Sequence, residues 1–377
     1  MKFLFASDSF KGSLTSQECI HLLSQSARKY FPGCEIVGIP MADGGEGTVD
    51  AVLAASGGER CSVTVKGPLG DLTEAVYGLM PNQTAIMEMS AASGLTLVPA
   101  EKLSPLKASS FGTGQMVIDA LNRGIRNVVL SIGGSATNDG GMGVMAALGV
   151  RFLDQKGHAL EPIGENLGAV QRVDLTGLDP RLQETRIRIM CDVTNPLCGP
   201  RGATFVFGTQ KGGTPQTLAL LEAGMVHYAR VLEQAAGRSI ADLPGAGAAG
   251  GVGAALCSFC GAELVSGVET VLSLVKFDKK VVGADLVVTG EGRLDSQSAR
   301  GKVVFGVGQR CKAHHVPAAA IVGSFQEDPD VVRSYGITQV YPLMQGDITL
   351  QQAIEQAKVL YARCADEMFR NFLNHTV

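Results

Sequence analysis

The first 56 residues decide the fold, and they open with the stretch KFLFASDSFKGS at positions 2–13. Residues 2–6 form a short apolar run that ends at Ser7 and Asp8. Thr15 and Glu18 then have the spacing of a capping box, and apolar residues recur at helical intervals up to a Pro-Gly stop at 32–33. This pattern predicts a strand, a loop and a helix in that order.

The same order follows once more, with a strand predicted over 36–40, a glycine-rich loop over 42–47 and a helix to about residue 56. The middle of the chain is richer in predicted strands, which cover 62–65, 74–80, 84–89, 127–132, 150–153, 187–190 and 204–207. Helices are predicted there over 111–123 and 215–236. The last hundred residues alternate again, with strands over 285–289, 318–322 and 340–343, a helix from about 301 and a helix over 350–373.

The two chain ends therefore share one pattern, which is typical of a parallel α/β layer. The fold class that we predict is α/β, with one parallel-sheet domain built from both ends and a mixed α/β domain inserted between them. We place the borders so that residues 1–66 and 280–377 form the first domain and residues 67–279 form the second.

Composition excludes several classes of protein. The chain has 377 residues, of which 45% are hydrophobic, and this apolar content excludes a disordered chain. Its 48 glycines fall in clusters without a G-x-y period, which excludes a collagen. The net charge is −4 without a long basic run, which argues against nucleic-acid binding. Neither a signal-peptide core nor a membrane-length apolar stretch is visible, and the nine cysteines are scattered. These features predict a cytoplasmic protein that binds neither nucleic acid nor membrane.

Four glycine-rich loops that carry Asp or Glu each follow a predicted strand. Their candidate binding residues are Asp8 and Lys11; Asp43, Gly44, Gly45, Glu46 and Thr48; Gly133, Gly134, Ser135, Asn138 and Asp139; and Glu291, Asp295, Gln297 and Lys302. In open α/β sheets, ligands bind outside the carboxyl ends of the strands. Glycine loops expose N–H groups to anions, and carboxylates beside a phosphate suit Mg²⁺. The loops therefore predict a site for a phosphorylated ligand and Mg²⁺.

Each loop taken alone could instead be a tight turn between a strand and a helix. Asp43 and Glu46 could also be solvated acids at a helix start. The repetition of one loop type after four predicted strands favours ligand binding over these alternatives.

A further acidic residue, Asp192, follows the predicted strand over 187–190 and precedes an Asn-Pro turn. Such a carboxylate could orient or deprotonate a substrate hydroxyl. Asn195 could contact a ligand or serve only as the turn residue.

Several familiar motifs do not fit the sequence. The stretch Gly301-Lys302 is followed by Val303, so it does not complete a P-loop. Residues 245–250 spell G-x-G-x-x-G but follow Leu243-Pro244 rather than a strand, which argues against dinucleotide binding. Cys257 and Cys260 lack a second pair or a nearby His, so we expect a buried helical pair rather than a zinc site.

Taken together and in order, residues 8–13, 42–48, 133–141, 191–197 and 290–302 resemble the signature blocks of the bacterial type I glycerate kinases. The similarity runs from the first strand to the C-terminal helix. The resemblance implies ATP-dependent phosphorylation of D-glycerate with Mg²⁺, and it favours 2-phosphoglycerate as the product. It also implies a Rossmann-like domain from both chain ends and an inserted mixed α/β domain, with the active site between the two.

On the basis of this resemblance we assign roles to the candidate residues. The predicted catalytic residues are Asp192, Lys11 and Asp43, with Asp192 as the base and Asp8 and Asp295 as alternatives to it. Lys11 and Lys302 are predicted to contact anionic groups. Asp43, Glu46 and Glu291 are predicted to contact Mg²⁺ or a substrate hydroxyl. The predicted partners are the small molecules ATP and D-glycerate.

Two other interpretations stay open at this point. The chain could be another nucleotide-dependent α/β transferase that acts on a small hydroxy acid, or a two-lobed protein that only binds a small molecule. The missing signal segment argues against an extracytoplasmic binding protein.

Overall fold

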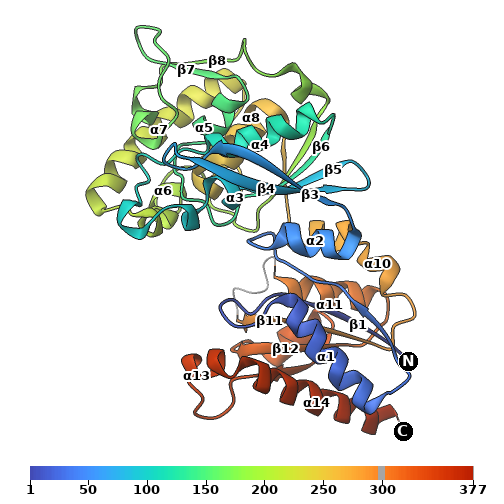
Figure 1. Cartoon of the computed structure of the whole chain (residues 1–377). Coiled ribbons are helices and arrows are strands. Elements are labelled where there is room, and N and C mark those ends of the chain that lie inside the picture. Colours follow the sequence, from blue (N-terminus) through green and yellow to red (C-terminus); the bar gives the residue numbers. More distant parts are fainter. Residues whose placement is uncertain (296–301, 377) are drawn as a thin grey trace. The chain divides into compact units, whose positions relative to one another are not determined.

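The computed structural model describes residues 1–295 and 302–376, and the chain divides into two compact units (Figure 1). Unit 1 consists of Met1–Asp43, Asp50–Gly57 and Gly267–Val377, and unit 2 consists of Gly44–Val49 and Gly58–Ser266. These borders differ from those expected from the sequence. The strand β3, Glu59–Lys66, pairs along its whole length with β4, Leu72–Met80, in the sheet of unit 2. The region of α9, Gly267–Leu274, belongs to unit 1, where Gly306 of α11 lies against Val268.

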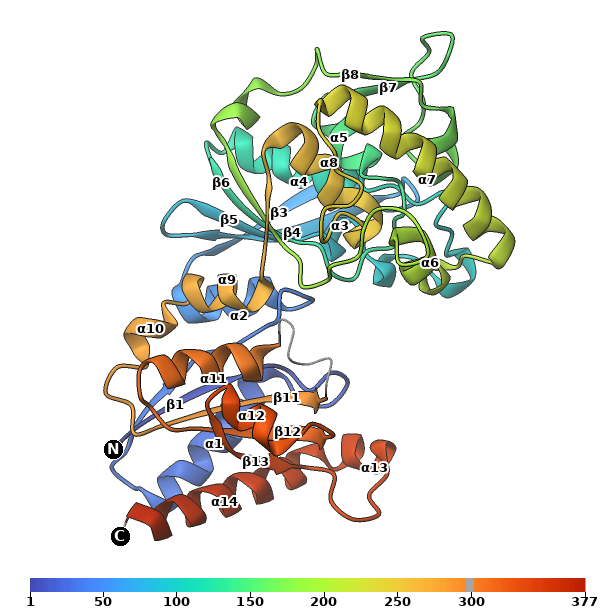
Figure 2. The same cartoon turned by 180° about the vertical axis from the view of Figure 1, so that it is seen from behind.

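Unit 1 is a five-stranded sheet with helices on both faces, and Figures 1 and 2 show α1 and α14 on one face and α11 on the other. Its elements are β1 Lys2–Ser7, α1 Ser16–Tyr30, β2 Glu35–Gly38, α9, α10 Phe277–Lys280, β11 Leu286–Leu294, α11 Val303–Ala313, β12 Ala318–Phe325, α12 Pro329–Ser334, β13 Ile337–Pro342, α13 Leu350–Glu355 and α14 Ala357–Thr376. The helix α2, Thr48–Ser56, contains the border between Val49 of unit 2 and Asp50 of unit 1.

The strands of unit 1 are all parallel and run in the order β13-β12-β11-β1-β2. The chain leaves β1 toward β2 on one side and returns to β11 on the other. This reversal creates a topological switch point between β1 and β11, where open α/β sheets bind their ligands. The parallel-sheet domain predicted from the two chain ends is therefore confirmed.

The β1 strand is buried on both faces, which explains its uninterrupted apolar sequence. Phe3 and Phe5 belong to the core cluster that also holds Leu23 of α1 and Phe369 of α14. The ring centroids of Phe3 and Phe369 are 5.3 Å apart in an edge-to-face contact. The predicted capping box of α1 is present, since Thr15 and Glu18 bond to each other's backbone N–H groups.

Unit 2 holds a six-stranded mixed sheet in the order β10-β9-β6-β5-β4-β3, in which β5, β6, β9 and β10 are parallel. Its further elements are β5 Thr84–Glu88, α3 Ser90–Ser93, α4 Phe111–Asn122, β6 Asn127–Ser131, α5 Met142–Ala147, β7 Arg151–Leu153, β8 Arg172–Asp174, β9 Arg186–Met190, α6 Ala203–Phe207, α7 Pro215–Ala236, α8 Val252–Cys260 and β10 Glu263–Val265. The strands β7 and β8 form a separate hairpin. The mixed α/β character predicted for the inserted domain is confirmed.

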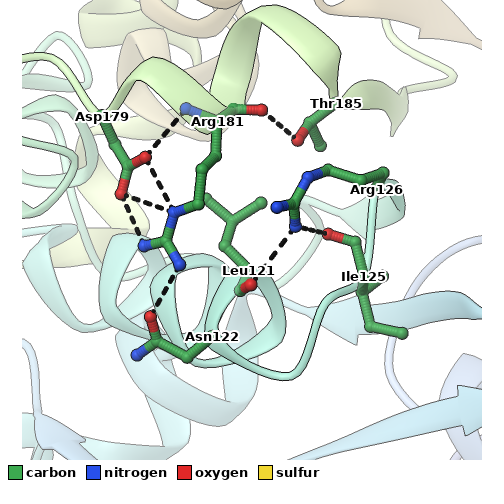
Figure 3. Close-up of polar contacts among 7 residues, drawn as sticks. All are labelled: Leu121, Asn122, Ile125, Arg126, Asp179, Arg181 and Thr185. Carbon is green, nitrogen blue, oxygen red and sulfur yellow. Dashed lines mark hydrogen bonds and ion pairs between the residues drawn. The ribbon is translucent and has the colours of Figure 1, made fainter.

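Two arginine side chains, those of Arg126 and Arg181, make polar contacts near the end of α4 and in the turn before β9, as Figure 3 shows. Arg126 donates to the carbonyl oxygens of Leu121 and Ile125 at 3.2 and 2.8 Å, where a helix C-terminus favours a cation. The guanidinium group of Arg181 makes a bidentate contact with the carboxylate of Asp179, and the shortest N–O distance is 2.7 Å. These contacts satisfy polar groups away from the candidate site residues.

Three predictions of local structure were wrong or incomplete. Residues 204–207 lie in the helix α6 instead of a strand, because the Gly202 carbonyl accepts from the N–H of Val206 and the turn buries only Ala203 and Thr204. Residues 290–293 continue the strand β11 and do not form a loop. The predicted C-terminal helix is interrupted at Gln356, which separates α13 from α14.

Candidate active site

A polar cavity lies at the switch point of unit 1. The register pairs Ser7 of β1 with Gly290 of β11, and the Asp8 N–H donates to the Gly290 carbonyl at 2.9 Å. The cavity has a volume of about 290 Å³, and it is lined by Asp8, Ser9, Lys11, Asp43, Glu291, Gly292, Arg293 and Lys302. Five of these eight residues were predicted from the sequence, namely Asp8, Lys11, Asp43, Glu291 and Lys302. Unit 1 thus brings together carboxylates and cations that are far apart in the sequence.

Glycine is required at two positions on β11 and β12 beside this cavity. A Cβ atom at Gly290 would lie 2.2 Å from the carbonyl oxygen of Ile321, and one at Gly323 would lie 2.2 Å from that of Gly292. Both distances are impossible for a real side chain, so the strands approach each other more closely here than substituted residues allow.

The carboxylates of the cavity hold protons unusually strongly. The pKa of Glu291 is raised to about 8, mainly by burial. The neighbouring acids Asp8, Asp43 and Asp295 contribute to this rise, and Lys302 opposes it. Burial also raises the pKa of Asp8 to about 7, with a contribution from Asp43, although the Ser9 N–H donates to Asp8 at 2.6 Å. A bound cation would relieve the unfavourable proximity of these acids.

Lysine and arginine side chains face this acidic group. The Lys302 Nζ atom donates to the Arg293 carbonyl at 2.9 Å and lies 3.8 Å from Glu291 Oε1 and 4.0 Å from Asp295 Oδ1. Glu291 Oε1 has no hydrogen-bond partner among the described residues. Lys11 is exposed at the cavity, and Arg293 pairs with Asp295 at 2.8 Å. The cavity therefore offers both cation and anion contacts.

A complete protein-only metal site is absent from the described residues, since no group of three His, Cys, Asp or Glu is placed to hold a metal ion. Mg²⁺ does not need such a group, because it commonly takes one or two carboxylates together with phosphate oxygens and water. The buried and unsatisfied oxygen of Glu291, beside Asp8 and Asp43, fits that donor set. Glu46, also predicted as a metal contact, is exposed and belongs to unit 2.

The glycine loops of unit 2 meet at the carboxyl ends of its own parallel strands. Ser131, the last residue of β6, donates its hydroxyl to the Gly44 carbonyl. A Cβ atom at Gly133 would lie 3.4 Å from the Cα atom of Gly45. Gly133 and Gly134 are exposed, and Gly134 has φ +71°. The two predicted loops at 44–48 and 133–135 are thus adjacent, and they meet mainly through the backbone of their glycines.

Two polar side chains at this edge were missed by the sequence analysis. Glu88, at the end of β5, accepts hydrogen bonds from the N–H groups of Gly47 at 3.2 Å and Val49 at 2.8 Å, so it holds the start of α2. Lys211 is almost fully buried and donates to the Ser135 hydroxyl at 3.1 Å and to the Thr137 carbonyl at 2.6 Å. Glu88 does not stand in a glycine-rich motif. Lys211 is followed by Gly212-Gly213, and this turn signal could have drawn attention to it.

Asp139, a predicted binding residue, makes its hydrogen bonds to other groups inside the protein. Its carboxylate accepts from the N–H and hydroxyl of Ser110, both at 2.7 Å, and from the N–H groups of Gly141 at 3.0 Å and Gly143 at 3.1 Å. Burial raises the pKa of Asp139, and these hydrogen bonds oppose that change. Asp139 therefore joins the start of α4 to the start of α5, which fixes the far end of its loop.

Three more predicted residues make contacts within their own loops or with neighbouring ones. Thr48 donates its hydroxyl to the Gly45 carbonyl at 2.7 Å. Asn195 donates to the Arg201 carbonyl at 2.7 Å, which agrees with the interpretation as a turn residue. Asn138 donates to the Thr204 hydroxyl at 3.1 Å. Asp192 follows β9 and is half-buried, and Gln297 lies outside the described residues.

The G-x-G-x-x-G stretch at residues 245–250 packs against the loop over 133–141. The Gly140 N–H donates to the Gly250 carbonyl at 2.8 Å. A Cβ atom at Gly250 would lie 2.3 Å from the Thr137 carbonyl oxygen, so close packing explains this glycine. Cys257 and Cys260 are both buried on α8, as predicted for a helical pair.

Comparison with known proteins identifies the family of this chain. Residues 3–373 match the model of the glycerate kinase family. The chain belongs to the glycerate kinase family. It is 45% identical over 358 residues to the glycerate 2-kinase of Escherichia coli, with 95% of this chain and 94% of the relative covered. It is 44% identical over 363 residues to the glycerate kinase of Halalkalibacterium halodurans, with 96% of each covered.

A solved structure of a protein described as glycerate kinase 2 from Salmonella typhimurium LT2 matches with a TM-score of 0.87 and 39% identity. The match covers 100% of this chain and 99% of that protein. The predictions that this chain is an enzyme, and that it belongs to the glycerate kinase family, are confirmed. Among the described helices, none is both long and apolar enough to cross a membrane.

Proposed function

We propose that this enzyme transfers the terminal phosphoryl group of ATP to D-glycerate in the presence of Mg²⁺ and releases 2-phosphoglycerate. The observation that carries the proposal is the cavity at the switch point of unit 1, where buried carboxylates lie beside lysines. The description of the Escherichia coli relative as a glycerate 2-kinase supports the choice of product.

Within this proposal, one or two of the cavity carboxylates Asp8, Asp43 and Glu291 would hold Mg²⁺, and phosphate oxygens and water would supply the other ligands. Bound there, the ion would neutralise charge on the phosphate oxygens. The donor set is suitable because Glu291 has a buried oxygen without a hydrogen-bond partner among the described residues. Glu46 does not line the cavity, so we leave it out of the magnesium set.

The remaining roles are assigned to side chains and backbone groups of the predicted loops. Lys302 and Lys11 line the cavity and would attract phosphate or carboxylate oxygens as point charges. The exposed backbone of Gly133 and Gly134 would bind a further anionic group. Asp192 follows a strand end and would accept the proton of the attacked hydroxyl as transfer proceeds. Phosphoryl transfer depends mainly on such positioning and charge stabilisation.

A coupled assay for ADP release tests the proposal. We expect ADP to form only when ATP, Mg²⁺ and D-glycerate are all present, and ³¹P NMR to identify 2-phosphoglycerate. Turnover that continues in EDTA would contradict the role of Mg²⁺. Equal rates with L-glycerate would contradict a site that distinguishes the two enantiomers. Appearance of 3-phosphoglycerate would overturn the product but leave the kinase assignment in place.

A further inference from the structure

A buried lysine stands directly behind the exposed glycines of unit 2. Lys211 ends the 3₁₀ turn Thr209–Lys211 and is 2% exposed. Its ammonium group donates to the hydroxyl of Ser135 at 3.1 Å and to the carbonyl of Thr137 at 2.6 Å. Ser135 follows Gly134 in the chain. The Lys211 side chain therefore holds the part of the loop that comes directly after the exposed backbone.

The position of Lys211 is fixed by the residue after it. Gly212 has φ +89°, and a Cβ atom there would lie 2.3 Å from the carbonyl oxygen of Leu103. A larger residue would not fit here, so the turn packs closely against the backbone at Leu103. The two hydrogen bonds of Lys211 place its charge at Ser135 and Thr137.

Stability alone does not account for a lysine at this position. Burial lowers the pKa of Lys211 to about 8, and Asp139 only partly offsets that change. The hydrogen bonds of the Asp139 carboxylate come from Ser110, Gly141 and Gly143, and not from Lys211. Burial of an ammonium group costs free energy that an apolar side chain of similar volume would not incur. Binding of an anion would account for a charge at this position.

We propose that Lys211 is a positioning residue for an anionic substrate group, a phosphate or a carboxylate, that binds at the exposed backbone of Gly133 and Gly134. Lys211 acts in two ways. Its hydrogen bonds fix Ser135 and Thr137, and its charge attracts an anion through a region that water does not screen. The inference rests on the proposed kinase function, since it assigns the loop to one of the two anionic substrates of that reaction.

The experiment compares Lys211→Met and Ser135→Ala with the wild-type protein. Lys211→Met removes the charge and both hydrogen bonds at nearly constant volume, whereas Ser135→Ala removes one hydrogen bond and leaves the charge. Lys280→Met is the matched control. The Lys280 ammonium also donates to a backbone carbonyl, that of Ala55, at 2.9 Å, and burial also lowers its pKa, but it lies in unit 1.

We expect Lys211→Met to raise the KM of one substrate by about tenfold or more, with little change in kcat or in melting temperature. A rise confined to ATP assigns the loop to a phosphate, and a rise confined to D-glycerate assigns it to the carboxylate. Ser135→Ala should change the same KM by less, and the double variant should be no worse than Lys211→Met alone. Lys280→Met should keep both KM values.

Two results would overturn the inference. One is wild-type KM values in Lys211→Met. The other is a fall in kcat with a lowered melting temperature and no selective change in KM, which would make the lysine a purely structural residue. If Lys211→Met does not fold, an unchanged KM in Ser135→Ala overturns the inference in its place.

A binding measurement separates this inference from the proposed function. If the wild-type protein turns over no glycerate, the kinase proposal fails, and calorimetric titration with inorganic phosphate and with D-glycerate still tests the lysine. Weaker binding of either probe to Lys211→Met than to wild type supports the inference. Equal binding, or none to either protein, overturns it.

Discussion

The two sheets of this protein both gather polar residues at the carboxyl ends of their parallel strands, but with opposite chemistry. The edge of unit 1 holds buried carboxylates, Asp8 and Glu291, whose pKa values are raised. The edge of unit 2 presents exposed glycine backbone at 133–134 and has a buried ammonium group behind it. An acidic edge suits a cation, and a glycine edge suits an anion. One architectural rule has therefore produced two edges of opposite chemistry in a single chain.

Removing a carboxylate from the edge of unit 1 should have the largest effect on activity. Glu291→Gln keeps the shape of the side chain but removes the charge that would hold Mg²⁺. We expect kcat/KM to fall by about 10³-fold, as expected when a preorganised electrostatic contact is lost. Steady-state kinetics at several Mg²⁺ concentrations measure the effect. Asp347→Asn, an exposed acid of the same unit, should behave as wild type. Normal activity of Glu291→Gln would remove the acidic edge from the reaction.

The carboxylate of unit 2 should affect stability more than it affects chemistry. Asp139→Ala leaves four donors without their acceptor in the interior, so we expect a loss of about 3 kcal/mol in the free energy of unfolding. Denaturant titration followed by circular dichroism measures it. Asp154→Ala is a useful control, because this acid also accepts two backbone N–H bonds but lies in an exposed turn. A stable but inactive Asp139→Ala would show that Asp139 contacts a substrate after all.

The lysines at the edge of unit 1 should matter for turnover and not for folding. Lys302→Ala should lower kcat/KM by about 100-fold, because Lys302 is near Glu291 and Asp295 and is mostly covered. Lys11→Ala should have a smaller effect, because Lys11 is exposed. Melting temperatures should hardly change, since exposed ion pairs contribute little stability. A larger loss in Lys11→Ala than in Lys302→Ala would reverse the order that the cavity predicts.

The acidic edge should also make stability depend on pH. The pKa of Glu291 rises from 4.5 to about 8 on folding, so the folded state keeps a proton that the unfolded state has lost between these values. Unfolding free energy should therefore fall as pH increases through this range, by about 1.4 kcal/mol per pH unit for each retained proton. Melts in EDTA from pH 5 to pH 8 measure the slope. Glu291→Gln should flatten it, and an unchanged slope in that variant would show that other groups cause it.

The smallest effect is expected at Cys257 and Cys260, which belong to neither edge. Both thiols are buried on α8, and replacing each by Ala removes only one buried sulfur atom. We expect a loss on the order of 1 kcal/mol in stability, with nearly intact kcat/KM and unchanged metal content. Elemental analysis beside kinetics is the test. Stoichiometric zinc in the wild type that disappears in the double variant would show that these residues form a metal site.

Much of the fold was legible in the sequence, because its signals are local. The capping box at Thr15 and Glu18, the apolar run of β1 and the Pro start of α7 each depend on neighbours a few residues away. The glycine loops were predictable for the same reason, since their composition alone marks backbone that must turn or approach a ligand. Belonging to the glycerate kinase family was also recognisable from the order of these blocks.

Other features were decided only by tertiary structure. The aromatic and β-branched residues at 205–206 favour a strand, but the available hydrogen bonds and the burial of Ala203 and Thr204 make a helical turn instead. Burial is the main cause of the raised pKa of Glu291, and Asp8 and Asp43 add to it. Asp8 is distant in the chain and comes close because β1 lies beside β11. Lys211 reaches Ser135 across 76 positions of sequence. Composition and periodicity indicate the local structure that a segment adopts. The burial of a side chain and the charges around it depend instead on which segments pack together, and the order of strands in the two sheets determines those contacts.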